Sequence, residues 1–237
     1  MEDFLSLIKK RKSSRVLFDP DKPVKKEDLR KILEAGSWAP TAHNMQNFEI
    51  VIVTDRSLIN TISSIKAPIS LTFVRENYRQ LSFSEEELKK KKTGVLGTMF
   101  PLAWQKPNIK KSDITEADRN TFMEEELNST PVLGIVLYDP TRRAPDSKGD
   151  FLGIVSLGCV MENMWLMASA LGMHFHIVSS LSSKAMEKEI KKLLHIPKPL
   201  VIAYSFRLGF AKHDHQYLRV RREVEDFAYQ NIYGSKW

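Results

Sequence analysis

The chain has 237 residues, of which 42% are hydrophobic and 27% charged, a balance that is typical of a globular protein and excludes a disordered chain. An excess of 36 Lys and Arg over 29 Asp and Glu gives a net charge of +7, which suits binding to a phosphorylated small molecule, a nucleic acid or a membrane surface. The single cysteine, Cys159, excludes an intramolecular disulfide and a cysteine-rich metal site, and no apolar run approaches the roughly 18 residues of a membrane span.

The N-terminus begins with the acidic residues Glu2 and Asp3 and lacks both an apolar signal core and a small-residue cleavage pattern. We therefore expect a cytoplasmic protein. Because the sequence shows no internal repeat and no low-complexity linker, we expect a single domain over residues 1–237.

Apolar residues at helical spacing predict two helices in the first 40 residues, one around residues 4–8 and one that includes Leu29 and Gly36. Residues 76–130 are polar and irregular, and so long an insertion is more often functional than idle. We expect these residues to form a helical flap that carries Met99, Phe100, Pro101 and Trp104.

Short runs rich in β-branched and aromatic residues predict strands at 48–53, 132–138, 175–178 and 200–206. Residues 156–171 are apolar almost all round, which predicts a helix buried on most sides, and Gly172 is its expected stop. An amphipathic helix is predicted at 184–194.

The positive charge gathers in two short clusters, at residues 9–15 and 219–222. Residues 89–92 are also basic, but they directly follow the acidic residues 85–87, a pattern typical of a solvated helix face. Aromatic residues are not interleaved with the two clusters as a nucleic-acid stacking platform would require. We therefore favour a small anionic ligand over nucleic acid.

Four segments, met in order along the chain, resemble one known family. Arg11-Lys12-Ser13-Ser14-Arg15, followed by Phe18, resembles the R-x-S-x-R signature that opens the FMN-dependent nitroreductases. Residues 40–48, PTAHNMQNF, are similar to that family's P-S-x-x-N-x-Q-P-W segment. Residues 156–172 resemble its long central helix ending in A-L-G, and residues 219–221 resemble its basic C-terminal pair.

The resemblance implies an α+β fold with a central, mainly antiparallel sheet surrounded by helices. It also implies an intertwined homodimer with two FMN sites at the subunit interface, with residues 76–130 over the substrate face. The implied reaction is ping-pong: NAD(P)H reduces the flavin and leaves, and an electron-poor small molecule then takes the electrons. No protein nucleophile is needed, because the cofactor carries the chemistry.

The residue types suit the parts of FMN. Guanidinium groups bind phosphate bidentately, which suits Arg11, Arg219 and Arg221, with Ser13 beside them. Arg15 suits the phosphate, the ribityl chain or the ring carbonyl edge, and Asn44 and Gln46 suit ribityl hydroxyls or a ring edge. Arg15 and Gln46 would also stabilise the reduced, anionic ring. The full set of expected cofactor contacts is Arg11, Lys12, Ser13, Arg15, Pro40, Thr41, Ala42, Asn44, Gln46, Ser179, Ser180, Arg219 and Arg221.

By resemblance, Pro40, Thr41 and Ala42 lie against the cofactor that the other subunit mainly binds. Two departures stand out. Asn47 occupies the place of a family proline, and Ser179 and Ser180 stand where many members have Glu-Gly or Gly-Gly with a backbone amide facing flavin N5. A backbone N–H survives a change of side chain, so we still expect that contact.

Structural interpretations compete with these assignments. A single arginine near a helix end can neutralise carbonyl dipoles, and Asn44 and Gln46 can close a turn. His43 is interpreted as a turn residue. The pairs His174 with His176 and His213 with His215 suggest metal ligands, but the chain supplies no Cys or carboxylate spacing to complete a site, so we expect structural histidines and no metal.

Three functions remain open. The first is an NAD(P)H-dependent flavoenzyme acting on nitroaromatics, quinones or similar acceptors. The second is a flavin enzyme of the same fold that reductively dehalogenates or dehydrogenates one specific metabolite. The third, least favoured, is a basic protein without flavin that binds nucleic acid or a membrane surface through Arg219, Arg221 and Arg222.

Overall fold

The computed structural model describes residues 3–66, 71–72, 74–76, 82–97, 110, 112, 124–213 and 218–236. The chain divides into two compact units. The larger unit comprises Met1–Ala67 and Phe122–His215, and the smaller comprises Pro68–Thr121 and Gln216–Trp237.

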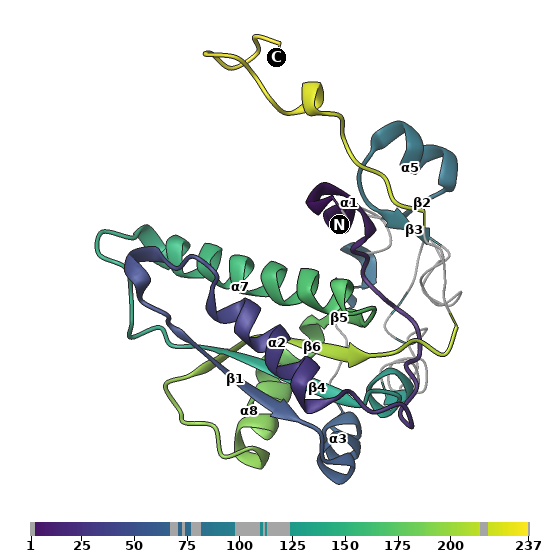
Figure 1. Ribbon diagram of the computed structural model, residues 1–237, viewed down its shortest axis with the longest axis vertical. Helices are drawn as coiled ribbons and strands as arrows, with labels where there is room; N and C mark the ends of the chain where they lie inside the picture. Colours follow the sequence, from purple (N-terminus) through teal and green to yellow (C-terminus); the bar gives the residue numbers. More distant parts are fainter. Residues whose placement is uncertain are drawn as a thin grey trace. The chain divides into compact units, whose positions relative to one another are not determined.

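The larger unit is built on a four-stranded sheet in the order β1-β4-β6-β5, with every neighbouring pair antiparallel (Figure 1). Its strands are β1 Phe48–Val53, β4 Val132–Tyr138, β5 His174–Val178 and β6 Val201–Gly209. The prediction of an α+β fold with an antiparallel sheet is confirmed. β6 continues past the predicted end at residue 206, because the charged residue that follows, Arg207, is fully buried rather than solvated.

Side chains of the central strand β4 alternate between two hydrophobic cores, as the two-residue period of a strand requires. Leu133 and Ile135 belong to the core that includes α3, Arg56–Ser63, and α8, Lys184–Leu193. Val132 and Val136 belong to the core that includes α2, Lys26–Ser37, and α7, Phe151–Ala170. The sheet is therefore sandwiched between two pairs of helices, as Figure 1 shows.

Helices α2 and α7 approach each other closely at Gly36. A Cβ at this position would lie 2.9 Å from Met164 Cγ, so only glycine fits without a shift of the Met164 side chain. α7 begins at Phe151, earlier than the predicted residue 156, and it ends at Ala170, one residue before the predicted end. Gly172 adopts φ +70°, a left-handed conformation that closes many helices.

The composition of α7 corrects one expectation. Together with the preceding turn, the stretch Lys148–Ala170 is long and apolar enough to cross a membrane by length and composition alone. Within the fold, however, Leu157, Val160, Met164 and Ala168 recur at helical spacing and are buried in the core between α7 and the sheet. One face of α7 is therefore apolar because it packs in the core.

In the smaller unit, β2 Ser82–Phe83 pairs in parallel with β3 Val95–Leu96, and α5 Glu85–Lys91 joins them. A capping box between Ser84 and Glu87 begins α5. The predicted solvated face of alternating charge is confirmed, since Lys89 pairs with Glu85 over 2.7 Å.

Of the predicted flap at 76–130, the structure describes residues 76, 82–97, 110, 112 and 124–130. The four side chains expected to line it, Met99, Phe100, Pro101 and Trp104, lie outside the described residues.

Candidate functional site

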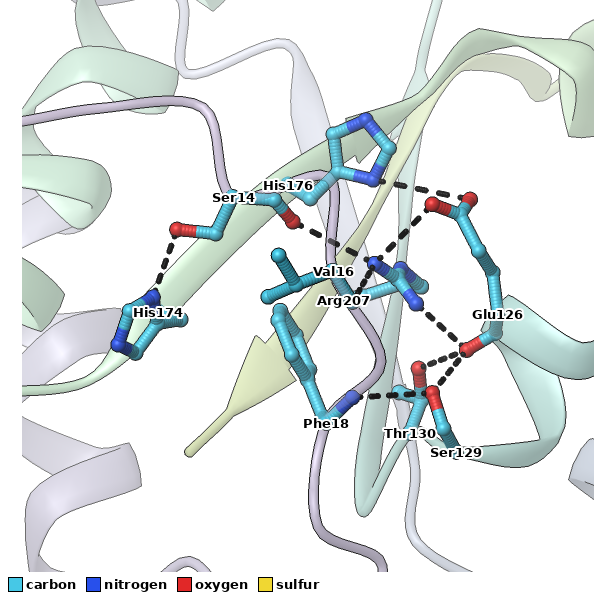
Figure 2. Close-up of polar contacts among 9 residues, drawn as sticks. All are labelled: Ser14, Val16, Phe18, Glu126, Ser129, Thr130, His174, His176 and Arg207. Carbon is cyan, nitrogen blue, oxygen red and sulfur yellow. Dashed lines mark hydrogen bonds and ion pairs between the residues drawn. The ribbon is translucent and has the colours of Figure 1, made fainter. Parts of the chain in front are cut away.

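The basic N-terminal segment is attached to the free edge of the sheet, beside β5. It follows the short helix α1, Phe4–Lys10. Ser13 forms a parallel bridge with Phe175, and the Ser14 amide donates to the Phe175 carbonyl over 3.2 Å. Ser14 Oγ lies 2.8 Å from His174 Nδ1, as Figure 2 shows. The segment that carries Arg11, Lys12, Ser13 and Arg15 is therefore held by main-chain and side-chain bonds to one strand.

Arg207 lies beneath this segment with none of its surface exposed (Figure 2). Its Nη2 donates to the carbonyls of Val16, over 2.9 Å, and of Ser14, over 3.4 Å. Its Nη1 donates to the Glu126 carbonyl over 2.6 Å, and Nη2 lies 3.5 Å from the Glu126 carboxylate. The guanidinium also stacks 4.5 Å from the centre of the Phe18 ring.

The Glu126 carbonyl is a shared acceptor, since Ser129 Oγ and Thr130 Oγ1 donate to it over 2.8 and 2.9 Å. Ser129 Oγ in turn accepts from the Phe18 amide over 3.1 Å. The N-terminal segment is thereby tied at both ends of residues 14–18, to β5 at Ser14 and to the segment before β4 at Phe18.

Two titratable groups flank Arg207. Burial raises the pKa of Glu126, and the charges of Arg207 and Arg15 oppose that rise. His176 Nδ1 lies 3.9 Å from the Glu126 carboxylate, and burial lowers the pKa of His176 well below 6.5, with the two arginines adding to the effect. His176 is consequently neutral at pH 7, and Glu126 is the counter-ion of Arg207.

Arg11 and Lys12 contact α7. Arg11 Nε lies 3.3 Å from Glu162 Oε1, and its guanidinium lies 4.4 Å from the centre of the Trp165 ring. Trp165 Nε1 donates to the Lys12 carbonyl over 3.2 Å. The Arg11 side chain is 18% exposed, whereas Arg15 is an exposed residue. Arg11 thus forms an ion pair with Glu162, and Arg15 is the more exposed of the two arginines.

The segment between α2 and β1 forms a compact turn around η1, Ala42–Asn44. Three of its residues, His43, Asn44 and Gln46, have positive φ values of 50°, 52° and 43°. Gln46 Nε2 donates to Asn44 Oδ1 over 3.0 Å, and the Gln46 amide donates to Thr41 Oγ1 over 3.2 Å. The structure brings these predicted residues together, with both amide side chains exposed.

Two further bonds fix this turn. The Ala42 amide donates to Ser156 Oγ on α7 over 3.0 Å. Asn47, which stands in place of the family proline, is 2% exposed and donates through Nδ2 to the Arg142 carbonyl over 3.3 Å. Pro40 is exposed at the start of the turn.

Ser179 and Ser180 lie in η6, Ser179–Ser182, directly after β5, and both are exposed. Because β5 also pairs with Ser13 and Ser14, one strand positions this turn and the N-terminal segment. The Ser179 carbonyl accepts from Ser182 Oγ over 2.7 Å, which closes the turn.

Arg219 and Arg221 belong to the smaller unit, whereas the other predicted contacts belong to the larger one. Arg221 lines a cavity of about 840 Å³ together with Lys91, Lys92 and Arg222. Lys92 is partly neutralised there, because its Nζ lies 2.9 Å from Asp226 and 3.7 Å from Glu223. The cavity therefore has a positive balance of charge within the smaller unit.

The predicted histidine pairs have different outcomes. His174 contacts Ser14 and His176 contacts Glu126, so both take structural positions beside the N-terminal segment. His213 is described and His215 lies outside the described residues. Among the described residues, no group of three or more His, Cys, Asp and Glu side chains could hold a metal ion.

Sequence reasoning missed Arg207 and Glu126. A signal for Arg207 was present, since a charged residue inside an otherwise apolar strand must find a buried partner. Nothing in the sequence distinguished Glu126 from the adjacent Glu124 and Glu125.

The donor set fits a phosphorylated flavin. An exposed guanidinium, a serine hydroxyl and a lysine suit a phosphate, and a pair of exposed side-chain amides suits hydroxyls or a ring edge. Both groups stand on turns that main-chain bonds hold in place, as ligand-binding residues require.

A model of the family described as "Nitroreductase family" matches residues 8–210. A proposed NADH dehydrogenase/NAD(P)H nitroreductase of Archaeoglobus fulgidus is 38% identical over 63 residues, which cover 27% of this chain and 35% of that relative. The chain thus matches about a third of the length of that protein.

Solved structures share the fold at low identity. A proposed enzyme of the same description from Parabacteroides distasonis has a TM-score of 0.62 at 17% identity, covering 98% of this chain and 100% of that one. A nitroreductase of Bacteroides fragilis with bound FMN has a TM-score of 0.60 at 16% identity, covering 98% of this chain and 100% of that one. A proposed nitroreductase of Desulfovibrio desulfuricans in complex with FMN has a TM-score of 0.62 at 15% identity, covering 98% of this chain and 99% of that one.

Proposed function

Because the chain belongs to the nitroreductase family, we propose that it is an FMN-dependent oxidoreductase that passes electrons from NAD(P)H to a nitroaromatic, a quinone or a similar acceptor. When bound, FMN accepts hydride from the nicotinamide and hands the electrons on to the acceptor. The observation that carries the proposal is the N-terminal segment, fixed on the sheet edge with Arg15 exposed beside it.

The chain's own contribution at the phosphate end is charge and position. Arg11, Lys12, Ser13 and Arg15 would hold the phosphate, and a guanidinium stays charged at any working pH. Arg11 would bind while keeping Glu162 as its neighbour, and Arg15 is the more exposed of the two arginines. Arg219 and Arg221 are proposed to complete this end from the C-terminal segment.

At the other end, Asn44 and Gln46 would bind ribityl hydroxyls or the ring edge. Their mutual hydrogen bond uses one donor of Gln46 and one acceptor of Asn44, and each amide keeps further hydrogen-bonding capacity for a ligand. Gln46 and Arg15 would stabilise negative charge on the reduced ring. The backbone amides at Ser179 and Ser180 would face the ring.

We also propose that the protein is a homodimer whose subunits meet along the first half of α7. Large apolar side chains are exposed there, with Phe151 at 66% and Ile154 at 61%, and Leu152 and Val155 beside them. Burying such a surface against a second copy is favourable by about 25 cal/mol per Å². The Ala42 amide is bonded to Ser156 on this same stretch of α7, which supports a role for Pro40, Thr41 and Ala42 at the partner's cofactor.

The proposal is tested by reconstituting the purified protein with FMN, removing free flavin by desalting, and following the oxidation of NADH and of NADPH with a nitroaromatic or a quinone as acceptor. We expect flavin to stay bound and nicotinamide oxidation to depend on the acceptor. A colourless protein that takes up no FMN would overturn the proposal. Bound FMN with inert generic acceptors would favour the alternative of one specific metabolite.

A further inference from the structure

We propose that Arg207, acting together with Glu126 and Ser129, is a positioning residue that shapes the main chain on both sides of Arg15 for recognition of the flavin phosphate. These three residues are called the Arg207 clamp. The inference rests on the proposed function, because it assigns the clamp to the phosphate end of the same site.

The contacts of the clamp converge on the residues that flank Arg15. Arg207 Nη2 donates to the carbonyls of Ser14 and Val16, which are the residues immediately before and after Arg15. Ser129 Oγ accepts from the Phe18 amide, two residues further on. The direction in which Arg15 leaves the main chain is therefore set by groups on β6 and on the segment before β4.

A lysine could not replace Arg207 in this arrangement. The guanidinium uses Nη1 for the Glu126 carbonyl and Nη2 for the two carbonyls beside Arg15, and its Cζ lies over the Phe18 ring. A planar fork can serve these directions together, whereas an ammonium group is a single point of charge on a flexible stem. An Arg207→Lys variant keeps the charge and loses the fork.

The charges of the cluster also favour an anion at Arg15. Glu126 compensates the buried Arg207, and His176 is neutral because burial and the two arginines lower its pKa. Arg15 is exposed, and its charge also acts on Glu126 and His176. Two arginines, one glutamate and a neutral histidine give this cluster more positive than negative charge, which favours an anion beside it.

A purely structural role for Arg207 makes a different prediction. If the residue only stabilised the fold, its loss would weaken all ligands of the site alike, or none. If it positions the segment for the phosphate, its loss weakens FMN and spares riboflavin, which is the same flavin without the phosphate.

The experiment is a fluorescence titration of the full-length protein, freed of flavin, with FMN and with riboflavin. We expect wild type to prefer FMN, and Arg207→Lys to bind FMN at least about tenfold more weakly with riboflavin affinity changed less than about twofold. Ile190→Val is the matched control, because Ile190 is fully buried, as Arg207 is, but its apolar side chain takes no part in the hydrogen bonds of the clamp. This variant should keep the wild-type preference.

An Arg207→Lys protein that keeps the wild-type ratio of the two affinities would overturn the inference and leave the proposed function intact. A wild type that binds neither flavin would overturn the proposed function itself. If Arg207→Lys does not fold, Ser129→Ala is the deciding variant, since it removes the hydroxyl that accepts from the Phe18 amide and donates to the Glu126 carbonyl. A preference for FMN over riboflavin that is reduced about threefold or more in this variant supports the clamp. An unchanged preference contradicts it.

Discussion

Arg207 Nη2 donates to the Val16 carbonyl over 2.9 Å, across 191 positions of sequence. This bond joins the last strand of the sheet to the segment that opens the family signature. The basic motif is therefore not a mobile N-terminal arm, because a buried side chain fixes its main chain. Predictions for the site can be made residue by residue on that basis.

Replacing Arg15 with Gln should weaken FMN binding about 10- to 100-fold, since a charge-assisted hydrogen bond contributes roughly 1.5–3 kcal/mol. Riboflavin should be affected less, because it lacks the phosphate. Flavin fluorescence titration measures both affinities. Arg30→Gln is the control, as Arg30 is an exposed arginine on α2, outside the proposed site. Equal FMN affinity in the Arg15 variant and wild type would remove Arg15 from the site.

Much of the fold could be predicted from the sequence, because strands and helices are encoded by local patterns. β1 and β4 have the predicted bounds, and Gly172 ends α7 as expected. The predicted end of β6 was wrong, because Arg207 interrupts the apolar pattern of the strand. The partners that allow Arg207 to be buried there lie far away in the sequence. Long-range polar pairing of this kind has no local periodicity from which to predict it.

The candidate site was predicted in part. The turn at 41–46 gathers Thr41, Asn44 and Gln46 as the motif indicated. Arg11 illustrates the limit, since its ion pair with Glu162 depends on how α7 packs beside the N-terminal segment. The cofactor contacts, the homodimer and the cytoplasmic location stay predictions.

Gln46→Ala should slow turnover about tenfold or more while FMN remains bound, because the amide is proposed to stabilise charge on the reduced ring. The measurement is the steady-state rate of NADPH or NADH oxidation by the reconstituted enzyme. His43→Ala is the matched control, because His43 lies in the same turn and its φ of 50° is similar to the φ of 43° at Gln46. If both variants lose activity to the same extent, the turn matters only as structure.

Asn47→Ala should lower the free energy of unfolding by about 1–2 kcal/mol. The variant leaves the Arg142 carbonyl without the bond from Asn47 Nδ2, in a position where the asparagine is 2% exposed. Urea denaturation measures the loss, with Glu49→Ala on the exposed side of β1 as a control of small effect. Equal stabilities of the two variants would show that Asn47 merely fills the place of the proline.

Ile154→Lys should convert the proposed dimer to monomers at micromolar concentration, because it puts a charge into the apolar face of α7. Sedimentation velocity gives the oligomeric state. Val201→Lys, at an apolar residue of β6 that is 37% exposed, should leave the dimer intact. A dimeric Ile154 variant would place the interface elsewhere.

The pH dependence of stability should contain a contribution from His176. Its pKa is lowered in the folded state, so the unfolded chain binds the proton more readily, and the stabilising effect is complete above 6.5 and is lost as pH falls below that value. The loss is at most about 1.4 kcal/mol per pH unit for one proton. Glu126 acts in the opposite sense: its raised pKa gives stability that is complete below 4.5 and is lost as pH rises.

His176→Gln should therefore show a shallower decline of stability between pH 6.5 and pH 5 than wild type. Urea unfolding at a series of pH values measures the two slopes. The groups that face His176 are Glu126, Arg207 and Arg15, all of which the variant retains. Parallel slopes would mean that His176 titrates alike in the folded and unfolded chains.

The central claim is that this chain holds FMN, and the visible absorption spectrum tests it most directly. The purified protein is mixed with FMN, desalted, and its flavin absorbance is compared with its protein concentration. We expect a bound-flavin spectrum with about one FMN per chain. A protein that emerges without flavin absorbance would contradict it, and the basic N-terminal segment would then need another ligand.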